Sequence, residues 1–321
     1  SGEVTSSGNL DYSIKRKNHI SFIKNDRMYI LGGISKSYVD HLINVDTLSS
    51  NSNMKFGNII YLDLITNRWD YEPIEKKIIE KTNGFGYSYT VHNNKLYIYG
   101  GCQIHEDISA SLHIIDISNN NTKMWEYEEE INNNHTSYEN IYNSSMICLN
   151  NELYIVGGIS HKYERKDGNI SISPNKLLEL HNKKTFDEID YLSIYKYNIN
   201  SKQWTEIVKK IDRSEPHLNN QELQTIHNHF SLVFNTKIII MGGKYYHSYN
   251  TTKSNTTIFE FNTSNNSIKK LSINDPPTNI SMIKQIKNNG DGYIFYNNNN
   301  NNDNDTELMV YQIKENDSKN G

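Results

Sequence analysis

Four stretches of the chain repeat one pattern of apolar and polar positions. Each has an apolar-alternating run, a two-residue polar turn and a second apolar run that ends in two glycines, as in Arg27-Met-Tyr-Ile-Leu-Gly-Gly33. The second runs of the other copies are Lys95–Gly101, Glu152–Gly158 and Lys237–Gly243. Alternation with a period of two residues predicts strands, and a polar pair between two such runs predicts a hairpin turn. The polar pairs are Asn25-Asp26, Asn93-Asn94, Asn150-Asn151 and Asn235-Thr236.

Two more strands are predicted after each diglycine. An apolar strand ends near an Asp or Asn, a short turn follows, and an outer strand begins close to a Trp. The segments are Ile59–Asp63 leading to Trp69, His113–Asp116 to Trp125, Tyr195–Asn198 to Trp204, and Phe259–Asn262 to Ile268, where Trp would stand. Each repeat therefore predicts a unit of four antiparallel strands.

This arrangement of a diglycine and a downstream Trp resembles the kelch repeat, and it covers essentially the whole chain. The resemblance implies an all-β fold, a kelch-type β-propeller of four-stranded antiparallel blades around a central channel. Glycines permit close backbone approach and positive φ, and Trp fills the space between blades, so we expect both to be structural. The expected structural residues are Gly32, Gly33, Gly100, Gly101, Gly157, Gly158, Gly242, Gly243, Trp69, Trp125 and Trp204.

A fifth, degenerate repeat begins at Ile280. It turns at Asn289–Gly292, carries Asn297-Asn298 at the diglycine position and has Glu307–Ile313 as its third strand. No fourth strand follows. We expect Leu10–Lys15 to supply the missing outer strand and to close the ring, because an unpaired sheet edge is a liability.

The expected domain is one propeller over residues 9–321. Residues 1–8 are expected to be an expression scar or disordered, since the chain starts at Ser1-Gly2 without Met. Five repeats are recognisable, and a sixth blade within 159–190 stays open, for example from Ile170–Ser173 with Leu177–Leu180.

Connections differ in length between the two ends of the predicted blades. The turns within the inner and outer hairpins are short. The long connections are 34–57, 102–110, 159–190, 244–255 and 297–306 after the second strands, and 73–85, 129–142 and 209–227 between blades. In antiparallel blades all of these fall on one face, which is the expected binding surface because loops on a rigid scaffold often carry function.

Tyr, His and Arg residues follow the glycines on that face. Tyr and Arg are enriched among the residues that dominate protein interfaces. The expected partner-binding residues are Tyr38, His41, His105, Tyr163, Arg165, Tyr245, Tyr246 and His247. That the tyrosines pack beneath their own loops stays an alternative for each of them.

Composition and charge narrow the function classes. The chain has 321 residues and a formal net charge of -4, with scattered lysines, which disfavours nucleic-acid binding. Its richness in Asn and Tyr suggests an AT-rich eukaryotic genome. No apolar run reaches the roughly 20 residues of a membrane span, so no membrane partner is expected.

The two cysteines, Cys102 and Cys148, form no CxxC motif, so neither a disulfide framework nor a thiolate metal site is indicated. No cofactor is expected, and a cytoplasmic location is favoured, with a nuclear one open. About eleven N-x-[ST] sequons favour secretion instead, but an Asn-rich chain produces them by chance. Asn143 of one sequon is predicted on an inner strand, where a glycan would not fit.

Some kelch propellers are enzymes, including galactose oxidase-like copper proteins and sialic-acid mutarotases. Cys102 and His105 are near each other in sequence, but nothing fixes a ligand set. His227-x-His229 could bind a metal or, as favoured here, merely open an inner strand. No nucleophile elbow, phosphate loop, HExxH or paired-carboxylate motif occurs.

The sequence thus favours a protein–protein interaction module over an enzyme or a carbohydrate-binding propeller. Resemblance to kelch proteins implies a scaffold, cytoskeletal, cell-polarity or ubiquitin-ligase adaptor role, and an unidentified protein or peptide as the partner.

Overall fold

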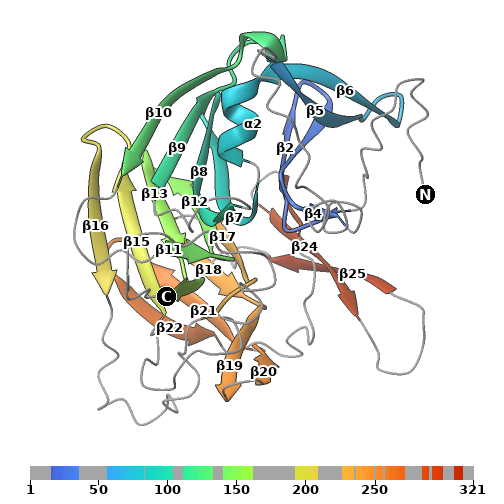
Figure 1. Cartoon of the computed structure of the whole chain (residues 1–321). Coiled ribbons are helices and arrows are strands. Elements are labelled where there is room, and N and C mark those ends of the chain that lie inside the picture. The colour runs from blue at the N-terminus through green and yellow to red at the C-terminus, as the bar shows by residue number, and fades with distance from the viewer. Residues whose placement is uncertain are drawn as a thin grey trace. The chain divides into compact units, whose positions relative to one another are not determined.

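The computed structural model in Figure 1 describes residues 16–35, 56–82, 84–103, 111–132, 140–161, 192–208, 226–234, 236–248, 251–255, 257–271, 284–288, 291–298 and 307–313. Over these ranges the chain is all-β. Four sheets have four antiparallel strands each, one sheet has three strands, and three have two. The helical elements of the described residues are α2 (Lys76–Thr82) and the 3-10 turn η1 (Thr122–Met124). The expected all-β class is confirmed.

The chain divides into two compact units. One comprises residues 1–148 and 160–181, and the other comprises residues 149–159 and 182–321. The expectation of one domain over 9–321 stays a prediction. The four-stranded sheets follow chain order, as the repeats predict. Their strands are β2 (Ile20–Lys24), β3 (Arg27–Leu31), β5 (Phe56–Asp63) and β6 (Arg68–Glu75); β7 (Gly84–His92), β8 (Lys95–Gln103), β9 (Ser111–Asp116) and β10 (Glu126–Asn132); β12 (Ser145–Leu149), β13 (Glu152–Val156), β15 (Ser193–Asn198) and β16 (Gln203–Val208); β17 (Phe230–Phe234), β18 (Lys237–Met241), β21 (Ile258–Asn262) and β22 (Ser267–Leu271).

The fifth repeat forms the three-stranded sheet. Its strands are β23 (Lys284–Asn288), β24 (Asp291–Asn298) and β25 (Glu307–Ile313). Glu307–Ile313 is thus a third strand, as the sequence predicts. The segment Leu10–Lys15, expected to complete this sheet, lies outside the described residues.

The inner hairpins close through asparagine-rich turns. Asn25 and Asp26 have φ of 47° and 59°, and Asn93 and Asn94 have 49° and 58°. Two successive left-handed residues define a type I′ turn, whose twist matches that of the flanking strands. The predicted hairpin turns are therefore confirmed at these positions. We call this end of each sheet the turn end, and the opposite end, marked by the glycine pairs, the diglycine end.

The Asp or Asn that ends each third strand caps the outer hairpin. The Oδ1 atom of Asp63 accepts hydrogen bonds from the amides of Ile65 (3.0 Å) and Thr66 (2.8 Å). Asp116, Asn198 and Asn262 accept equivalent bonds in the other sheets. These bonds lower the pKa of the Asp63 carboxyl, because they stabilise its charged form. The side chain therefore fixes the turn locally, which explains why the repeat carries Asp or Asn there.

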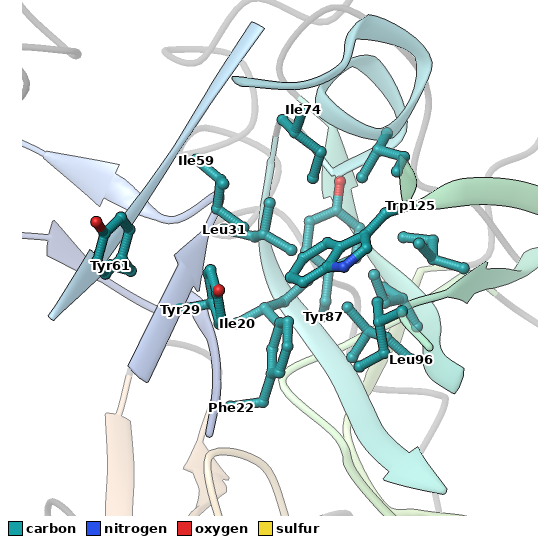
Figure 2. Close-up of a cluster of buried hydrophobic side chains, with 14 residues drawn as sticks. Ile20, Phe22, Tyr29, Leu31, Ile59, Tyr61, Ile74, Tyr87, Leu96 and Trp125 are labelled. Carbon is teal, nitrogen blue, oxygen red and sulfur yellow. The ribbon is translucent and has the colours of Figure 1, made fainter. Parts of the chain in front are cut away.

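Buried side chains of the first two sheets form one core, shown in Figure 2. Trp125 is 2% exposed, and its ring centroid lies 5.0 Å from that of Tyr29 and 5.9 Å from that of Phe22. Its Nε1 donates to the carbonyl of Asn119 at 2.8 Å. The second sheet thus packs a Trp against the inner strands of the first.

Trp125 is nevertheless out of register with the other two tryptophans. Trp69 pairs with Leu62 and Trp204 with Tyr197, each one residue before the capping Asp or Asn. In the second sheet Tyr127 takes that place, paired with Ile115. The η1 turn lengthens this outer hairpin, so Trp125 precedes the strand, and the expected equivalence of the three tryptophans is corrected. Trp69 and Trp204 are half-buried.

Helix α2 lies within the connection 73–85, for which the sequence predicts a long loop and no helix. Ile78 is fully buried in the core of the first two sheets, and Lys76 pairs with Glu80 one turn later at 3.4 Å. A helix of seven residues with so few apolar positions gives no readable periodicity. Its place beside the strands is visible in Figure 1.

Candidate interaction surface

The sequence predicts eight partner-binding residues at the diglycine end. Five of them, Tyr38, His41, His105, Tyr163 and Arg165, lie outside the described residues. The other three, Tyr245, Tyr246 and His247, belong to strand β19 (Lys244–Ser248). The described part of this surface is therefore built from the backbone around the glycine pairs and from the segments that follow them.

Each inner hairpin continues past its diglycine for one to three residue pairs. In the first repeat β1 (Arg16–Lys17) pairs with β4 (Ile34–Ser35), and in the third β11 (Asn140–Tyr142) pairs with β14 (Ile159–His161). In the second repeat, strands β7 and β8 themselves continue past the diglycine, with Gly84 paired with Gln103. In the fourth, His227 forms a single bridge with Lys244. Residues on either side of the diglycine therefore project as a short ribbon from each of these four sheets.

In the first three repeats, the first glycine of the pair lies against the backbone of the next repeat. A Cβ on Gly100 would lie 2.0 Å from the carbonyl oxygen of Ile141, and one on Gly157 would lie 2.4 Å from that of Ile226. Both glycines also have positive φ, 68° and 57°. The amide of Gly158 donates to the Ile226 carbonyl at 2.9 Å. Only a residue without a Cβ allows this approach, so the glycines act as joints between repeats.

A left-handed residue stands opposite each diglycine, seven positions before the hairpin turn. In repeats one to four this residue is Asn18, Gly86, Asn143 and Asn228 in turn, and its φ lies between 52° and 71°. The amide of Gly86 donates to the carbonyl of Asn18 at 3.1 Å, and the amide of Asn143 donates to that of Gly86 at 2.7 Å. Backbone hydrogen bonds thus run from repeat to repeat. This arrangement was missed in the sequence, although the spacing from the turn is regular.

Asn143 precedes strand β12, whereas the sequence analysis predicted it on the strand. Its side-chain Oδ1 would lie 2.7 Å from a Cβ on Gly86. Asn255 of another sequon is also buried, and its Nδ2 donates to the carbonyls of Gly242 and Thr257, both at 2.9 Å. The buried Asn255 has no room for a glycan, which agrees with a chance origin of its sequon, whereas Asn143 is half-buried.

The residues after Gly243 form a hairpin, not the open connection expected over 244–255. Strand β19 pairs with β20 (Thr251–Ser254), with Tyr245 opposite Lys253 and a bulge between Tyr246 and Ser248. At its base the amide of Asn255 donates to the carbonyl of Gly243 at 2.9 Å. The two hydrogen bonds between His227 and Lys244 hold the other side at 3.0 and 2.9 Å.

The His227-x-His229 pair lies just ahead of strand β17. Burial, together with a smaller effect of the nearby His227, lowers the pKa of His229 to about 3, so His229 is neutral at pH 7. Its ring lies close to the glycines: the Cε1 atom would be 2.9 Å from a Cβ on Gly157. This placement agrees with the interpretation that the pair opens an inner strand.

A cluster of polar groups lies at the outer strands of the second sheet. His113 Nδ1 and the Tyr127 hydroxyl are 2.7 Å apart, the hydroxyl donates to Glu130 at 3.4 Å, and Lys81 Nζ is 3.2 Å from Glu130. Burial lowers the pKa of His113 to about 4 and raises that of Tyr127. Both are neutral at pH 7, and the ion pair of Lys81 with Glu130 joins α2 to β10.

Two features are absent from the part of the chain that the structure describes. No three His, Cys, Asp or Glu side chains come together there as a metal-ion cluster. No helix in the same ranges is long and apolar enough to cross a membrane. Cys148, in the third sheet, is in no disulfide bond among the described residues.

Comparison with known proteins shows a similarity of fold to a solved structure. No family model and no curated protein matches the chain. A solved structure titled "Structure of YjhT" is similar over 88% of this chain and 72% of its own, with a TM-score of 0.53 and 12% sequence identity. At that identity the likeness concerns the fold alone.

Proposed function

We propose that this chain is a kelch-type β-propeller that binds another protein at the diglycine end of its sheets. The observation that carries the proposal is the repeated joint: a left-handed glycine pair whose first member admits a carbonyl of the next repeat. Because this contact between neighbouring repeats recurs with similar geometry, it supports a propeller in which each blade is related to the next by a constant rotation. The fold likeness at a TM-score of 0.53 supports the same class.

The proposed ring has five blades and is closed by Leu10–Lys15. Support comes from the fifth sheet, which has three strands among the described residues where the other repeats have four. A fourth strand from the N-terminal segment would give every repeat four strands and would leave no open edge in the fifth sheet.

Protein binding is the function that the elaboration of the diglycine end supports best. The turn end carries the two-residue turns of the inner hairpins and the outer turns capped by Asp or Asn. The diglycine end instead carries the short ribbons and the β19–β20 hairpin, whose strand β19 contains Tyr245 and Tyr246. Tyr supplies a large contact area at low entropic cost, which suits an interface.

Affinity capture from cell extract tests this proposal. We expect the combined replacement of Tyr163, Arg165, Tyr245 and Tyr246 by Ala to abolish capture of the partner while the melting temperature stays unchanged. The control is Ile65→Ala with Met124→Ala at the turn end, because these side chains are 76% and 56% exposed. The control variant should capture the partner normally.

Retained capture by the fourfold variant would contradict a binding surface at the diglycine end. Loss of capture by the turn-end variant alone would move the interface to the opposite end. Turnover of galactose or sialic acid by the purified chain would instead support the enzyme alternative.

A further inference from the structure

A histidine is buried on the core face of the second sheet. His113 of β9 is paired with Ile98 of β8, and its side chain is fully buried. Residues directly opposite each other in a sheet point to the same face, and Ile98 belongs to the core of the first two sheets. The ordinary pKa of histidine places its change of charge between pH 5 and 8. A group that can acquire a charge therefore faces an apolar core.

The hydrogen bonds of His113 leave one ring nitrogen without a partner. The Tyr127 hydroxyl donates to Glu130 at 3.4 Å, so its oxygen accepts from the Nδ1–H group of His113 at 2.7 Å. In this tautomer Nε2 carries the lone pair. That atom is buried and has no hydrogen-bond partner among the described residues. A proton added at Nε2 would find no acceptor in the closed structure, and an unpaired buried N–H on a charged ring is costly.

Charged groups from three elements surround this histidine. Lys81 Nζ of α2 is 3.2 Å from Glu130 Oε2 of β10, and Lys77 Nζ of α2 lies 4.4 Å from the centre of the Tyr127 ring. Glu75 of β6 accepts a hydrogen bond from the Tyr127 amide at 3.3 Å. Glu130 would attract an imidazolium, and Lys81 would repel it. Burial outweighs both effects and lowers the pKa of the histidine to about 4.

Helix α2 connects this cluster to the joint between the first two repeats. The carbonyl oxygen of Thr82, its last residue, would be 2.5 Å from a Cβ on Gly32. Just beyond the helix, the Gly84 carbonyl accepts from the amide of Gly33 at 2.7 Å. Lys81, one residue before Thr82, forms the ion pair with β10. A displacement of α2 from β10 therefore loosens the contact at the first diglycine.

We infer that His113 is an acid-sensitive latch, which keeps α2 on β10 while its ring is neutral and releases the helix when Nε2 takes a proton. Opening gives the protonated Nε2 water as its hydrogen-bond acceptor. No covalent bond other than the new N–H bond changes, and the proton comes from the solvent. The inference does not depend on what the diglycine end binds.

The direction of the pH effect follows from the two pKa values of His113. In the open form the ring is hydrated and has the ordinary pKa of 6.5, whereas in the closed form the pKa is about 4. The open form therefore binds the proton more tightly. The closed form is favoured most above pH 6.5, and this preference is lost as the pH falls towards 4, by up to about tenfold per pH unit.

Hydrogen–deuterium exchange of the full chain, read by mass spectrometry and corrected for the intrinsic exchange rate, tests the inference. We expect the protection of residues 76–82, and of the amides of Gly32 and Gly33, to fall by about tenfold between pH 6.5 and pH 5.0. Glu130 stays ionised over this interval. Although burial raises the pKa of Glu130, the hydrogen bond from Lys81 and the neighbouring charges lower it overall.

His113→Gln keeps a side chain that can hydrogen-bond Tyr127 but cannot become charged. Its protection of residues 76–82 should be the same at both pH values. The matched control is His92→Gln, which removes a histidine from the turn end of β7 in the same sheet. This control should show the fall of the unmodified chain. A fall of the same size in His113→Gln, or no fall in the unmodified chain, would overturn the inference.

A second measurement needs no variant and therefore covers a His113→Gln chain that does not fold. In proton NMR spectra of the unmodified chain, the histidine ring in contact with the Tyr127 ring should titrate with a midpoint below about pH 5. A midpoint near pH 6.5 in the folded chain would mean that the closed structure accommodates the charge, and the latch would be ruled out.

Discussion

At the scale of single residues, the repeat depends on backbone positions where the side chain decides what fits. Gly100 has a φ of 68° and would place a Cβ 2.0 Å from a carbonyl oxygen. Asn94 has a φ of 58° in a tight turn. Both positions are left-handed, but only the glycine is also a point of close approach between repeats.

Replacing these two residues by Ala separates the two effects. We expect Asn94→Ala to lower the free energy of unfolding by about 1 kcal/mol, the cost of a left-handed non-glycine residue. Gly100→Ala adds a clash with the backbone of Ile141 and should cost at least about 3 kcal/mol. Urea denaturation followed by circular dichroism measures both. Equal losses would mean that the close approach does not hold the repeats together.

Much of the residue-scale pattern could be predicted from the sequence because it is local. Asn25-Asp26 and Asn93-Asn94 identify their turns by residue type alone. The left-handed Asn143 was not predicted, since its role depends on a hydrogen bond to another repeat. The left-handed Asn228 was not predicted either. The same holds for Asn255, whose burial follows from the hairpin that it closes.

At the scale of elements, the alternation of apolar and polar residues predicted the hairpins and their order. It did not predict the elements inserted between them. The η1 turn shifts Trp125 ahead of its strand, and Tyr127 takes the register position of Trp69 and Trp204. Helix α2 is too short to show a period. The β19–β20 hairpin lacks alternation because Tyr245, Tyr246 and His247 are consecutive. Its place among the expected binding residues stays a prediction.

The two kinds of Trp position should differ in energy. Trp125→Ala removes a buried ring that packs on Phe22 and Tyr29, and we expect a loss of about 3–5 kcal/mol in the free energy of unfolding. Trp69→Ala, at a half-buried outer position, should cost about 1–2 kcal/mol. Chemical denaturation measured by circular dichroism compares them. A larger loss at Trp69 would contradict the core shown in Figure 2.

At the scale of the whole molecule, we propose that the five repeats form one ring closed by the N-terminal segment. Sequence and structure agree on the order of the strands in the four diglycine repeats. The closing strand was predicted from the count of strands and stays a prediction, because no local pattern encodes a contact between the beginning and the end of the chain. The proposed binding surface at the diglycine end depends on the same ring.

Thermal unfolding of a chain lacking residues 9–15 tests that claim most directly. If Leu10–Lys15 completes the sheet of β23, β24 and β25, its deletion costs several kcal/mol. The melting temperature should then fall by about 5 °C or more, and a synthetic peptide of residues 9–16 should restore it. Deletion of residues 314–321 serves as the control and should leave it unchanged. An unaltered melting temperature after deletion of residues 9–15 would contradict the closed ring.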